Sequence, residues 1–312
     1  MLGTRDVYGD TLAELGQAYP QIVVLDADLS SSTKTGVFGK AFPDRFFNMG
    51  VCEQSLVDTA CGFALAGKLP FVSTFAIFTM RAWEQIRQCV AIQNLNVKIV
   101  ASHGGVTVGE DGASAQAIED VALMRVLPRM SVIVPADGIE TRAVIRALVE
   151  HVGPTYVRVA RAKFPVILPK DYVFRLGRGV VLHEGGDATV VAMGVMVSRA
   201  LEAARLLKEE GLSVRVINMS TVKPIDEELL HRAALETGGV VTAEEHSVIG
   251  GLGGAVAELL AERCPVPMRR IGMQDRFGTS GDAESLLAHF GLTAEAIAEA
   301  VRDVVKRKAH PR

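Results

Sequence analysis

Short runs of β-branched and other apolar residues alternate with helical hydrophobic patterns along the whole chain. In one helical stretch Trp83, Ile86 and Val90 recur at the spacing of a helix face. Continuous apolar strands separated by amphipathic helices indicate mainly parallel sheets with helices on both faces, which is an α/β fold. The expected strands are 22–25, 46–49, 70–74, 97–101, 131–134, 156–159, 189–193, 214–219, 239–243 and 268–271, and the expected later helices are 198–210, 226–235, 253–262 and 294–306.

A charged stretch with two prolines, 161–178, interrupts this alternation, and the pattern restarts after it. A chain of 312 residues is long enough for two domains. We therefore expect two consecutive sheets: a first domain at 1–165, a linker at 166–179 and a second domain at 180–312.

Composition excludes several classes of function. The 33 basic and 36 acidic residues leave a net charge of −3, which gives no reason to expect a nucleic-acid or membrane-surface partner. No apolar run is long enough to cross a membrane, and Arg5, Asp6 and Asp10 stand where a signal peptide needs an apolar segment. The four cysteines follow no metal-ligand spacing. These features predict a cytoplasmic protein with reduced thiols and no metal site of its own.

Ligands of open parallel sheets bind beyond the carboxyl ends of the strands. Acidic, aromatic and basic side chains follow the first-domain strands, so they are expected to share one edge. They are Asp26, Asp28 and Ser32 after 22–25, Glu53 after 46–49, Phe75 and Phe78 after 70–74, His103 after 97–101, and Arg161 after 156–159. Such a mixture of apolar and ionisable groups is typical of a small-molecule site.

Each of these residues also has a purely structural interpretation. Glu53 can be an acid that the helix dipole favours in a first turn, and the two phenylalanines can belong to the core. His103 can be an ordinary loop residue, and Arg161 can pair with an acid. The Gly-rich segment HSVIGGLGGAV lacks the spacing of a nucleotide-binding loop and indicates a tight turn with close helix packing.

The same segments resemble a known family. Similar to the pyrimidine-binding domain of transketolases are, in order, GTRDVYGDTLAEL, LDADLSSST, NMGVCEQSLVDTACGFALAG, FVSTFAIFTMRAWEQIR, SHGGVTVGEDGASAQAIEDVALMRVLP and YVRVARA. STVKPID and TAEEHSVIGGLGGAVAELL resemble the transketolase C-terminal domain. The likeness covers nearly the whole chain, although the tail QDRFGTSGDAESLLAHFGL is also similar to deoxyxylulose-phosphate synthases.

The resemblance implies thiamine diphosphate as the cofactor, which carries the difficult chemistry itself. In the family, the glutamate that matches Glu53 hydrogen-bonds to N1′ of the aminopyrimidine, which helps C2 of the thiazolium to lose its proton. Aromatic rings orient the pyrimidine by stacking. The implied catalytic residues are Glu53 and His103, and the implied cofactor-binding residues are Glu53, Phe75, Phe78, Asp28 and Leu29.

The implied reaction is reversible transfer of a two-carbon ketol unit from a ketose phosphate to an aldose phosphate, the carbohydrate chemistry of the pentose phosphate pathway. Guanidinium groups suit the phosphate of such sugars. The implied substrate-binding residues are Arg5, Ser32, His103, Asp111, Arg161 and Gln116.

Two positions depart from the family. Ala115 stands where relatives usually have His or Gln, so either Gln116 or a partner residue takes over that contact, or donor handling is altered. Arg81 stands where many relatives have Tyr, a milder change.

Full-length transketolases carry an N-terminal domain in which a GDG motif and a later Asn hold Mg²⁺ and the diphosphate, and this sequence contains no GDG. The chain also begins where the second domain of the long enzymes begins. It thus resembles the C-terminal subunit of a split transketolase. The implied partner is an N-terminal subunit that holds Mg²⁺ (or Ca²⁺), with two copies of this chain inside a heterotetramer.

Three alternatives remain open. A 2-oxoacid dehydrogenase β-subunit shares this domain plan but lacks the TRxxYG opening and the GEDG block. Deoxyxylulose-phosphate synthase has fewer residues between its STF motif and the position of Arg81. A non-catalytic paralogue is the third alternative, and Ala115 is the feature that suggests it.

Overall fold

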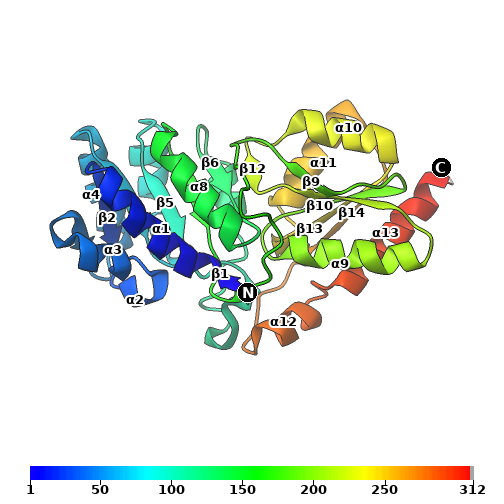
Figure 1. Cartoon of the computed structure of the whole chain (residues 1–312), viewed down its shortest axis with the longest axis horizontal. Helices are drawn as coiled ribbons and strands as arrows, with labels where there is room; N and C mark the ends of the chain where they lie inside the picture. The colour runs from blue at the N-terminus through cyan, green and yellow to red at the C-terminus, as the bar shows by residue number, and fades with distance from the viewer. Residues whose placement is uncertain (310–312) are drawn as a thin grey trace.

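The computed structural model describes residues 1–309 and contains two large sheets lying along the long axis of the molecule (Figure 1). The first sheet has the strand order β12-β6-β7-β5-β4-β2-β3, and the second has the order β14-β13-β10-β11-β9. All pairings are parallel except those of the edge strands β12 and β9, which confirms the expected α/β fold with mainly parallel sheets.

The strands begin and end close to their expected positions. Those of the first sheet are β2 (Ile22–Asp26), β3 (Phe46–Asn48), β4 (Leu69–Ser73), β5 (Lys98–Ala101), β6 (Ser131–Ile133), β7 (Thr155–Arg158) and β12 (Thr221–Lys223). Those of the second are β9 (Val180–His183), β10 (Ala188–Ala192), β11 (Val214–Asn218), β13 (Val240–Ser247) and β14 (Met268–Met273). β12 and β9 were not expected, and neither was a small pair formed by β1 (Leu2–Gly3) and β8 (Lys163–Phe164).

Helices cover both faces of the first sheet. Ile22 and Val24 of β2 are buried against α1 (Thr4–Ala18), α3 (Gly36–Ala41) and α8 (Gly138–Glu150). The alternate residues Val23 and Leu25 are buried on the opposite face with α4 (Glu53–Leu65) and α7 (Asp120–Arg125). Because both faces are buried, the strands are apolar at every position, which made them visible in the sequence.

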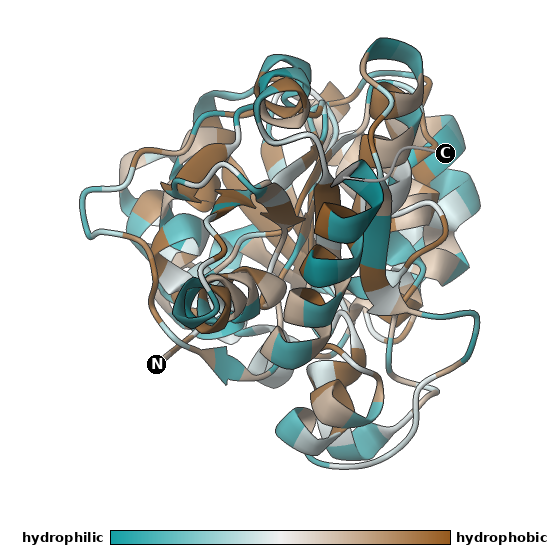
Figure 2. Ribbon diagram, turned by 90° about the vertical axis from the view of Figure 1, so that its right-hand side faces the viewer, coloured by the Kyte–Doolittle hydropathy of each residue, from teal (hydrophilic) through white to brown (hydrophobic). Residues whose placement is uncertain are grey.

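The second sheet is built in the same way. α9 (Met196–Glu209) and α13 (Ala294–Ala309) lie on one face, and α10 (Glu227–Thr237) and α11 (Leu252–Arg263) lie on the other (Figure 1). In the end-on view the apolar strands lie inside and the polar sides of the helices face outward (Figure 2). No helix within residues 1–309 is long and apolar enough to span a bilayer.

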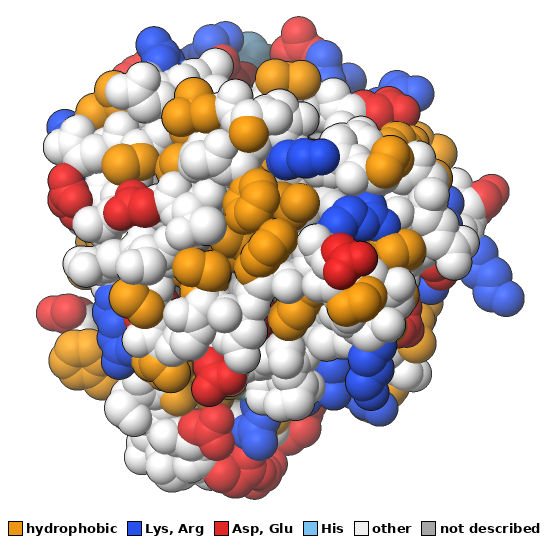
Figure 3. Space-filling model, turned by 90° about the vertical axis from the view of Figure 1, so that its left-hand side faces the viewer, with side chains coloured by type: hydrophobic (Ala, Val, Ile, Leu, Met, Phe, Trp, Pro, Cys, Tyr) orange, Lys and Arg blue, Asp and Glu red, His pale blue; other side chains and the backbone are white. Residues whose placement is uncertain are grey.

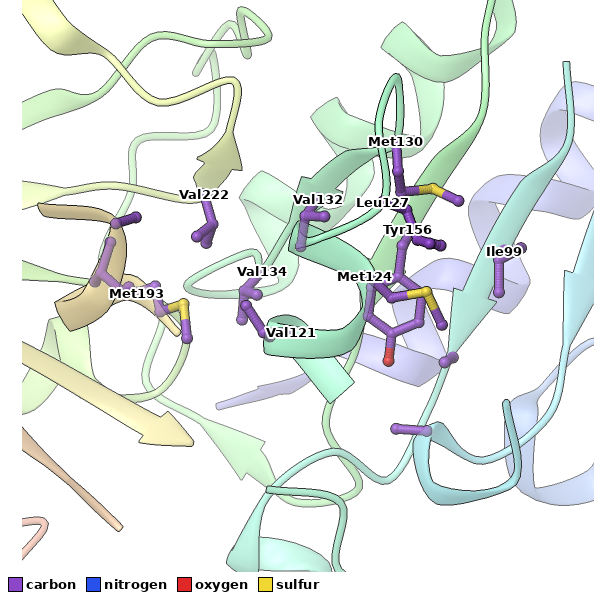
Figure 4. Close-up of a cluster of buried hydrophobic side chains, with 14 of the residues drawn as sticks. Ile99, Val121, Met124, Leu127, Met130, Val132, Val134, Tyr156, Met193 and Val222 are labelled. Carbon is purple, nitrogen blue, oxygen red and sulfur yellow. The ribbon is translucent and has the colours of Figure 1, made fainter. Parts of the chain in front are cut away.

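The two sheets share one apolar core. Figure 4 shows Val132 and Val134 of the first half of the chain close to Met193 and Val222 of the second half, and all four belong to one buried cluster. β12 extends this union because Thr221 pairs with Ile133 of β6, so a strand from the second half of the chain completes the first sheet.

The segment between the two halves is also packed. Asp137 caps α8 by accepting a hydrogen bond from Glu140 N at 2.9 Å, and its other carboxylate oxygen accepts from Ile167 N at 2.8 Å and Leu168 N at 2.9 Å. Leu168 and Phe174 are buried. The expected linker at 166–179 is therefore held against the first sheet, while the expected domain limits themselves stay a prediction.

One expected helix is irregular. The stretch around Trp83 consists of a 3₁₀ turn, η2 (Met80–Ala82), the short α6 (Trp83–Gln85) and a π-helical segment, η3 (Ile86–Ala91). Such π segments inside helices are rare and often lie near functional sites.

Lys98 of β5 is fully buried, and its ammonium group donates hydrogen bonds to His151 O at 2.7 Å and Gly153 O at 2.8 Å. Burial disfavours the charged form and lowers the pKa of Lys98 from 10.5 to about 7. Between these two pH values the unfolded chain holds a proton that the folded chain lacks, so the stability of the fold rises with pH across this window.

We therefore expect the free energy of unfolding to rise between pH 7 and pH 9, with Lys98 contributing at most about 1.4 kcal/mol per pH unit. Lys98→Met removes that contribution and flattens the slope, whereas Lys68→Met, at an exposed position, leaves it unchanged. Urea unfolding at several pH values measures both slopes. Equal slopes in the unaltered chain and Lys98→Met would contradict the assignment.

Candidate active site

The carboxyl ends of β7, β5, β4, β2 and β3 lie next to one another in the first sheet, which we call the carboxyl edge. Glu53 begins α4 beyond β3, Phe75 precedes the short α5 (Ala76–Thr79) beyond β4, and His103 lies two residues beyond β5. The topology thus brings together the side chains that the strand-end argument predicted.

Glu53 is a buried carboxylate with one side-chain partner in the described part of the chain. It is 4% exposed, and Arg81 Nη1 donates to its two oxygens at 3.3 and 3.4 Å. Its place in the first turn of α4 also suits the helix dipole, so the structural and functional interpretations of this acid are compatible. The contact with Arg81 was not foreseen from the sequence.

Next to Glu53 lies a wall of stacked rings. The guanidinium of Arg81 lies 4.6 Å from the centre of the Phe78 ring, and Phe78 stacks on Phe75 with centroids 5.5 Å apart and planes 9° apart. Phe75 in turn stacks on the imidazole of His103, with 3.6 Å between centroids. Both phenylalanines are only half-buried, so they are available to a ligand in a way that core residues are not.

His103 joins the ring wall to a group of basic side chains. Its Nδ1 lies 2.8 Å from Ser102 Oγ, and its Nε2 lies 3.3 Å from Arg5 Nη1. An arginine can only donate, so Nε2 must accept and the neutral ring carries its proton on Nδ1, which donates to Ser102. His103 has a backbone φ of 60°, a sparsely populated conformation that is frequent at functional sites.

Burial, and after it the positive charges of Arg5 and Arg161, lower the pKa of His103 from 6.5 to about 3. The ring is therefore neutral over the ordinary pH range. Two guanidinium groups and a neutral imidazole side by side form a site suited to an anion such as a phosphate.

The two arginines are held by contacts to nearby loops. Arg5 Nη1 donates to Ser32 O at 3.1 Å, which places Ser32 beside the basic group through its backbone. Arg161 Nη1 donates to Val108 O and to Glu110 Oε2, the latter at 2.9 Å, and lies 3.9 Å from Asp111. Asp111 itself is exposed, as a substrate contact requires.

Asp28 and Leu29 lie in a turn that a buried acid shapes. Asp26 accepts from Leu29 N at 2.6 Å and from the hydroxyls of Thr33 and Thr35, and burial raises the pKa of this carboxyl. The exposed Asp28 accepts from an asparagine amide, Asn48 Nδ2, at 2.8 Å. Asp26 therefore supports the turn from below, while Asp28 lies at the surface.

Gln116 does not face this group. It is 3% exposed, and its amide nitrogen donates to the backbone oxygens of Val106, Gly109 and Thr279 at 3.2, 3.3 and 2.9 Å. It therefore cannot replace the polar contact that Ala115 lacks without breaking these hydrogen bonds.

The glycine-rich segment after β13 is a packing device, as its spacing indicated. Glu244 accepts from Leu252 N and Gly253 N at the start of α11, and a Cβ on Gly251 would lie 2.0 Å from the Glu244 carboxylate. Within residues 1–309 no three His, Cys, Asp or Glu residues gather in a way that could hold a metal ion.

A buried carboxylate beside stacked, half-exposed rings fits an aminopyrimidine, which offers a flat ring and a ring nitrogen that can share a proton. The neighbouring basic group fits a sugar phosphate. These two parts are joined by continuous contacts from Glu53 through Arg81, Phe78, Phe75 and His103 to Arg5.

Comparison with known proteins agrees with this geometry. Residues 1–166 match the sequence profile of the transketolase pyrimidine binding domain, and residues 177–297 match that of the transketolase C-terminal domain. Among curated proteins, the putative transketolase C-terminal section of Methanocaldococcus jannaschii is 49% identical, with 98% of this chain and 97% of that protein covered. The 6-deoxy-6-sulfo-D-fructose transketolase subunit SqwH of Clostridium sp. (strain MSTE9) is 43% identical, with coverages of 97% and 95%.

Among solved structures, one described as a split gene transketolase, inactive beta4 tetramer, superposes with a TM-score of 0.93 at 53% identity. The match covers 99% of this chain and 100% of that one. The chain therefore belongs to the transketolase family and corresponds to the C-terminal section of a split transketolase. Its two domains imply dependence on thiamine diphosphate.

The neutral state of His103 is directly measurable. We expect the ring nitrogens to keep one proton, on Nδ1, from pH 8 down to pH 5, because its pKa lies near 3. Below pH 6.5 the unfolded chain takes up a proton that folded His103 refuses, so this residue makes the fold less stable as the pH falls. ¹⁵N-resolved NMR, with His103→Gln to assign the signal, tests this. A titration midpoint near 6.5, or protonation of both nitrogens at pH 6, would refute it.

Proposed function

We propose that this chain is the C-terminal subunit of a thiamine diphosphate-dependent transketolase. With a separate N-terminal subunit, it transfers a two-carbon ketol unit between ketose and aldose phosphates. The observation that carries the proposal is the continuous series of contacts from the buried Glu53 to the basic side chains of Arg5 and His103. It places a seat for the cofactor's pyrimidine directly beside a seat for a phosphate.

Thiamine diphosphate supplies a thiazolium carbon that, once deprotonated, takes up the ketol unit. Glu53 shares a proton with N1′ of the pyrimidine, while Phe75 and Phe78 hold the ring by offset stacking. Arg81 contacts both oxygens of Glu53, so the ring nitrogen has to replace at least one of these contacts. The side chain of Arg81 is 55% exposed and therefore has space to move away.

The phosphate of the sugar is held by Arg5 and Arg161, with His103 between the cofactor seat and the basic group. Because His103 is neutral, its role is to orient hydroxyl or phosphate oxygens and to exclude water, and the charge comes from the arginines. Asp111, exposed beside Arg161, is placed to accept a hydrogen bond from a sugar hydroxyl.

A partner subunit supplies what this chain does not contribute, namely the Mg²⁺ (or Ca²⁺) and the groups around the diphosphate. Two relatives of nearly equal length support this, because one is described as a C-terminal section and the other as a subunit. The similar structure described as an inactive β4 tetramer supports it further. Val51 and Leu65, at the two ends of α4, are 70% and 76% exposed. The face seen in Figure 3 gathers hydrophobic side chains near its centre, as a contact between two copies requires.

The donor sugar differs among relatives, since one of them is described as a 6-deoxy-6-sulfo-D-fructose transketolase subunit. Ala115 is half-buried and offers only a methyl group, and Gln116 is committed to backbone carbonyls. We propose that donor recognition in this protein does not use a polar side chain at this position, and that the partner subunit or the cofactor supplies that contact.

Reconstitution tests the proposed function. This chain is purified alone and together with a separately encoded protein that carries GDG…Asn, and ketol transfer between sugar phosphates is assayed with Mg²⁺ and thiamine diphosphate. We expect turnover with both chains and none with this chain alone, because the diphosphate's charge must be neutralised by a metal site.

Binding of the cofactor is measured in parallel by calorimetry. Tight binding of thiamine diphosphate to this chain alone would contradict the need for a partner. A complex that forms and binds the cofactor but transfers no ketol unit would favour the non-catalytic alternative.

A further inference from the structure

The loop at 103–117 carries His103 and Asp111 and connects β5 to the segment before α7. It closes on itself where Gly105 N donates to Ala117 O at 2.7 Å, and part of it forms the 3₁₀ segment η4 (Val106–Asp111). Irregular loops hold functional side chains only as firmly as their contacts to rigid elements allow. The contacts of this loop therefore decide how well His103 is placed.

One of its main supports comes from the second sheet. Glu245 lies on β13, is 6% exposed, and its Oε1 accepts a hydrogen bond from Thr107 N at 2.6 Å. A Cβ on Gly105 would lie 2.3 Å from the Glu245 carboxyl group, so the loop backbone rests directly on this side chain. Gly105 also has a φ of +83°, which favours glycine.

Arg158, at the end of β7, continues this support on the side of the first sheet. Its Nη2 donates to Glu245 O at 2.8 Å and to Ala117 O at 3.2 Å, and a Cβ on Gly104 would lie 1.9 Å from its Nε. The two glycines after His103 are thus the positions where Arg158 and Glu245 approach the loop. A larger side chain at either would push the loop away.

Two further hydrogen bonds join the end of the loop to the second half of the chain. Gln116 Nε2 donates to Thr279 O at 2.9 Å, and Ser247 N donates to Ile118 O at 2.7 Å. The loop that bears the implied substrate residues is therefore fastened to the second domain at three places: Glu245, Thr279 and Ser247.

We propose that Glu245 is a positioning residue for the sugar-phosphate site: through Thr107 it fixes the loop that carries His103, so that the C-terminal domain holds the substrate site in shape. This inference rests on the proposed function. Glu245 acts through the loop backbone and does not touch the substrate. Its loss therefore weakens recognition of the phosphate more than it changes the cofactor seat, which lies on α4 and α5.

The loop contact itself is tested on the chain alone by hydrogen–deuterium exchange. A hydrogen bond to a buried charged group is strong enough that Glu245→Ala is expected to speed exchange of amides 104–112 by about tenfold or more. Glu245→Gln keeps an acceptor oxygen without the charge and is expected to give a smaller increase, about threefold. The matched control is Glu258→Ala, which removes another second-domain carboxylate that pairs with a first-domain arginine, Arg125, away from the loop.

In the reconstituted complex, Glu245→Ala is expected to raise the KM for a phosphorylated acceptor about tenfold, with a much smaller change in kcat. The KM for an acceptor without phosphate, and the Kd for thiamine diphosphate, are expected to match those of Glu258→Ala. A variant that merely destabilises the fold would change all these constants together.

Exchange rates in Glu245→Ala equal to those of the unaltered chain overturn the proposal, and so does an equal rise in KM for both kinds of acceptor. Should Glu245→Ala fail to fold, Glu245→Gln decides alone: unchanged exchange at 104–112 overturns the proposal. A complex without ketol transfer removes the proposed function, while the exchange experiment still decides whether Glu245 holds the loop.

Discussion

Arg158 carries a positive charge into the boundary between the two sheets, where only 5% of the residue is exposed. Its guanidinium lies 3.5 Å from Asp120 and donates to the backbone of Glu245, and Tyr156 donates to the same Asp120 at 2.7 Å. Removing one partner of such a buried charge typically costs about 3–5 kcal/mol. Because its partners come from α7, from β13 and from the loop after β5, the domain arrangement and the geometry of the site depend on the same charge.

The positions of the sheets were predictable because their strands are buried on both faces. Ile22 to Leu25 alternate between two helix-covered faces, so every residue is apolar and the strand stands out in the sequence. The edge strands β12 and β9 were missed for the opposite reason. Thr221 is in a strand because Ile133 lies opposite it, and this pairing depends on how the two halves of the chain meet, which local sequence does not encode.

The candidate site was predictable where it follows from topology alone. Since parallel strands end at one edge, Glu53, Phe75 and His103 had to be neighbours, and the structure places them so. What local sequence could not supply was the direction of individual side chains. Gln116 turns inward to backbone carbonyls, Arg81 reaches the carboxylate of Glu53, and the support from the second sheet spans more than a hundred residues. The only sequence signal for that support was the glycine pair after His103.

The central claim is that Glu53 activates the cofactor, and exchange of its C2 proton for deuterium measures this most directly. In the complex of this chain with its N-terminal partner, rapid-quench NMR follows that exchange before any sugar is added. Glu53→Gln is expected to slow it about a hundredfold or more, the usual contribution of a placed proton-transfer group. Glu262→Gln, at an exposed position on α11, is expected to leave it unchanged. Equal exchange rates in Glu53→Gln and the unaltered complex, with the cofactor bound in both, would contradict the account.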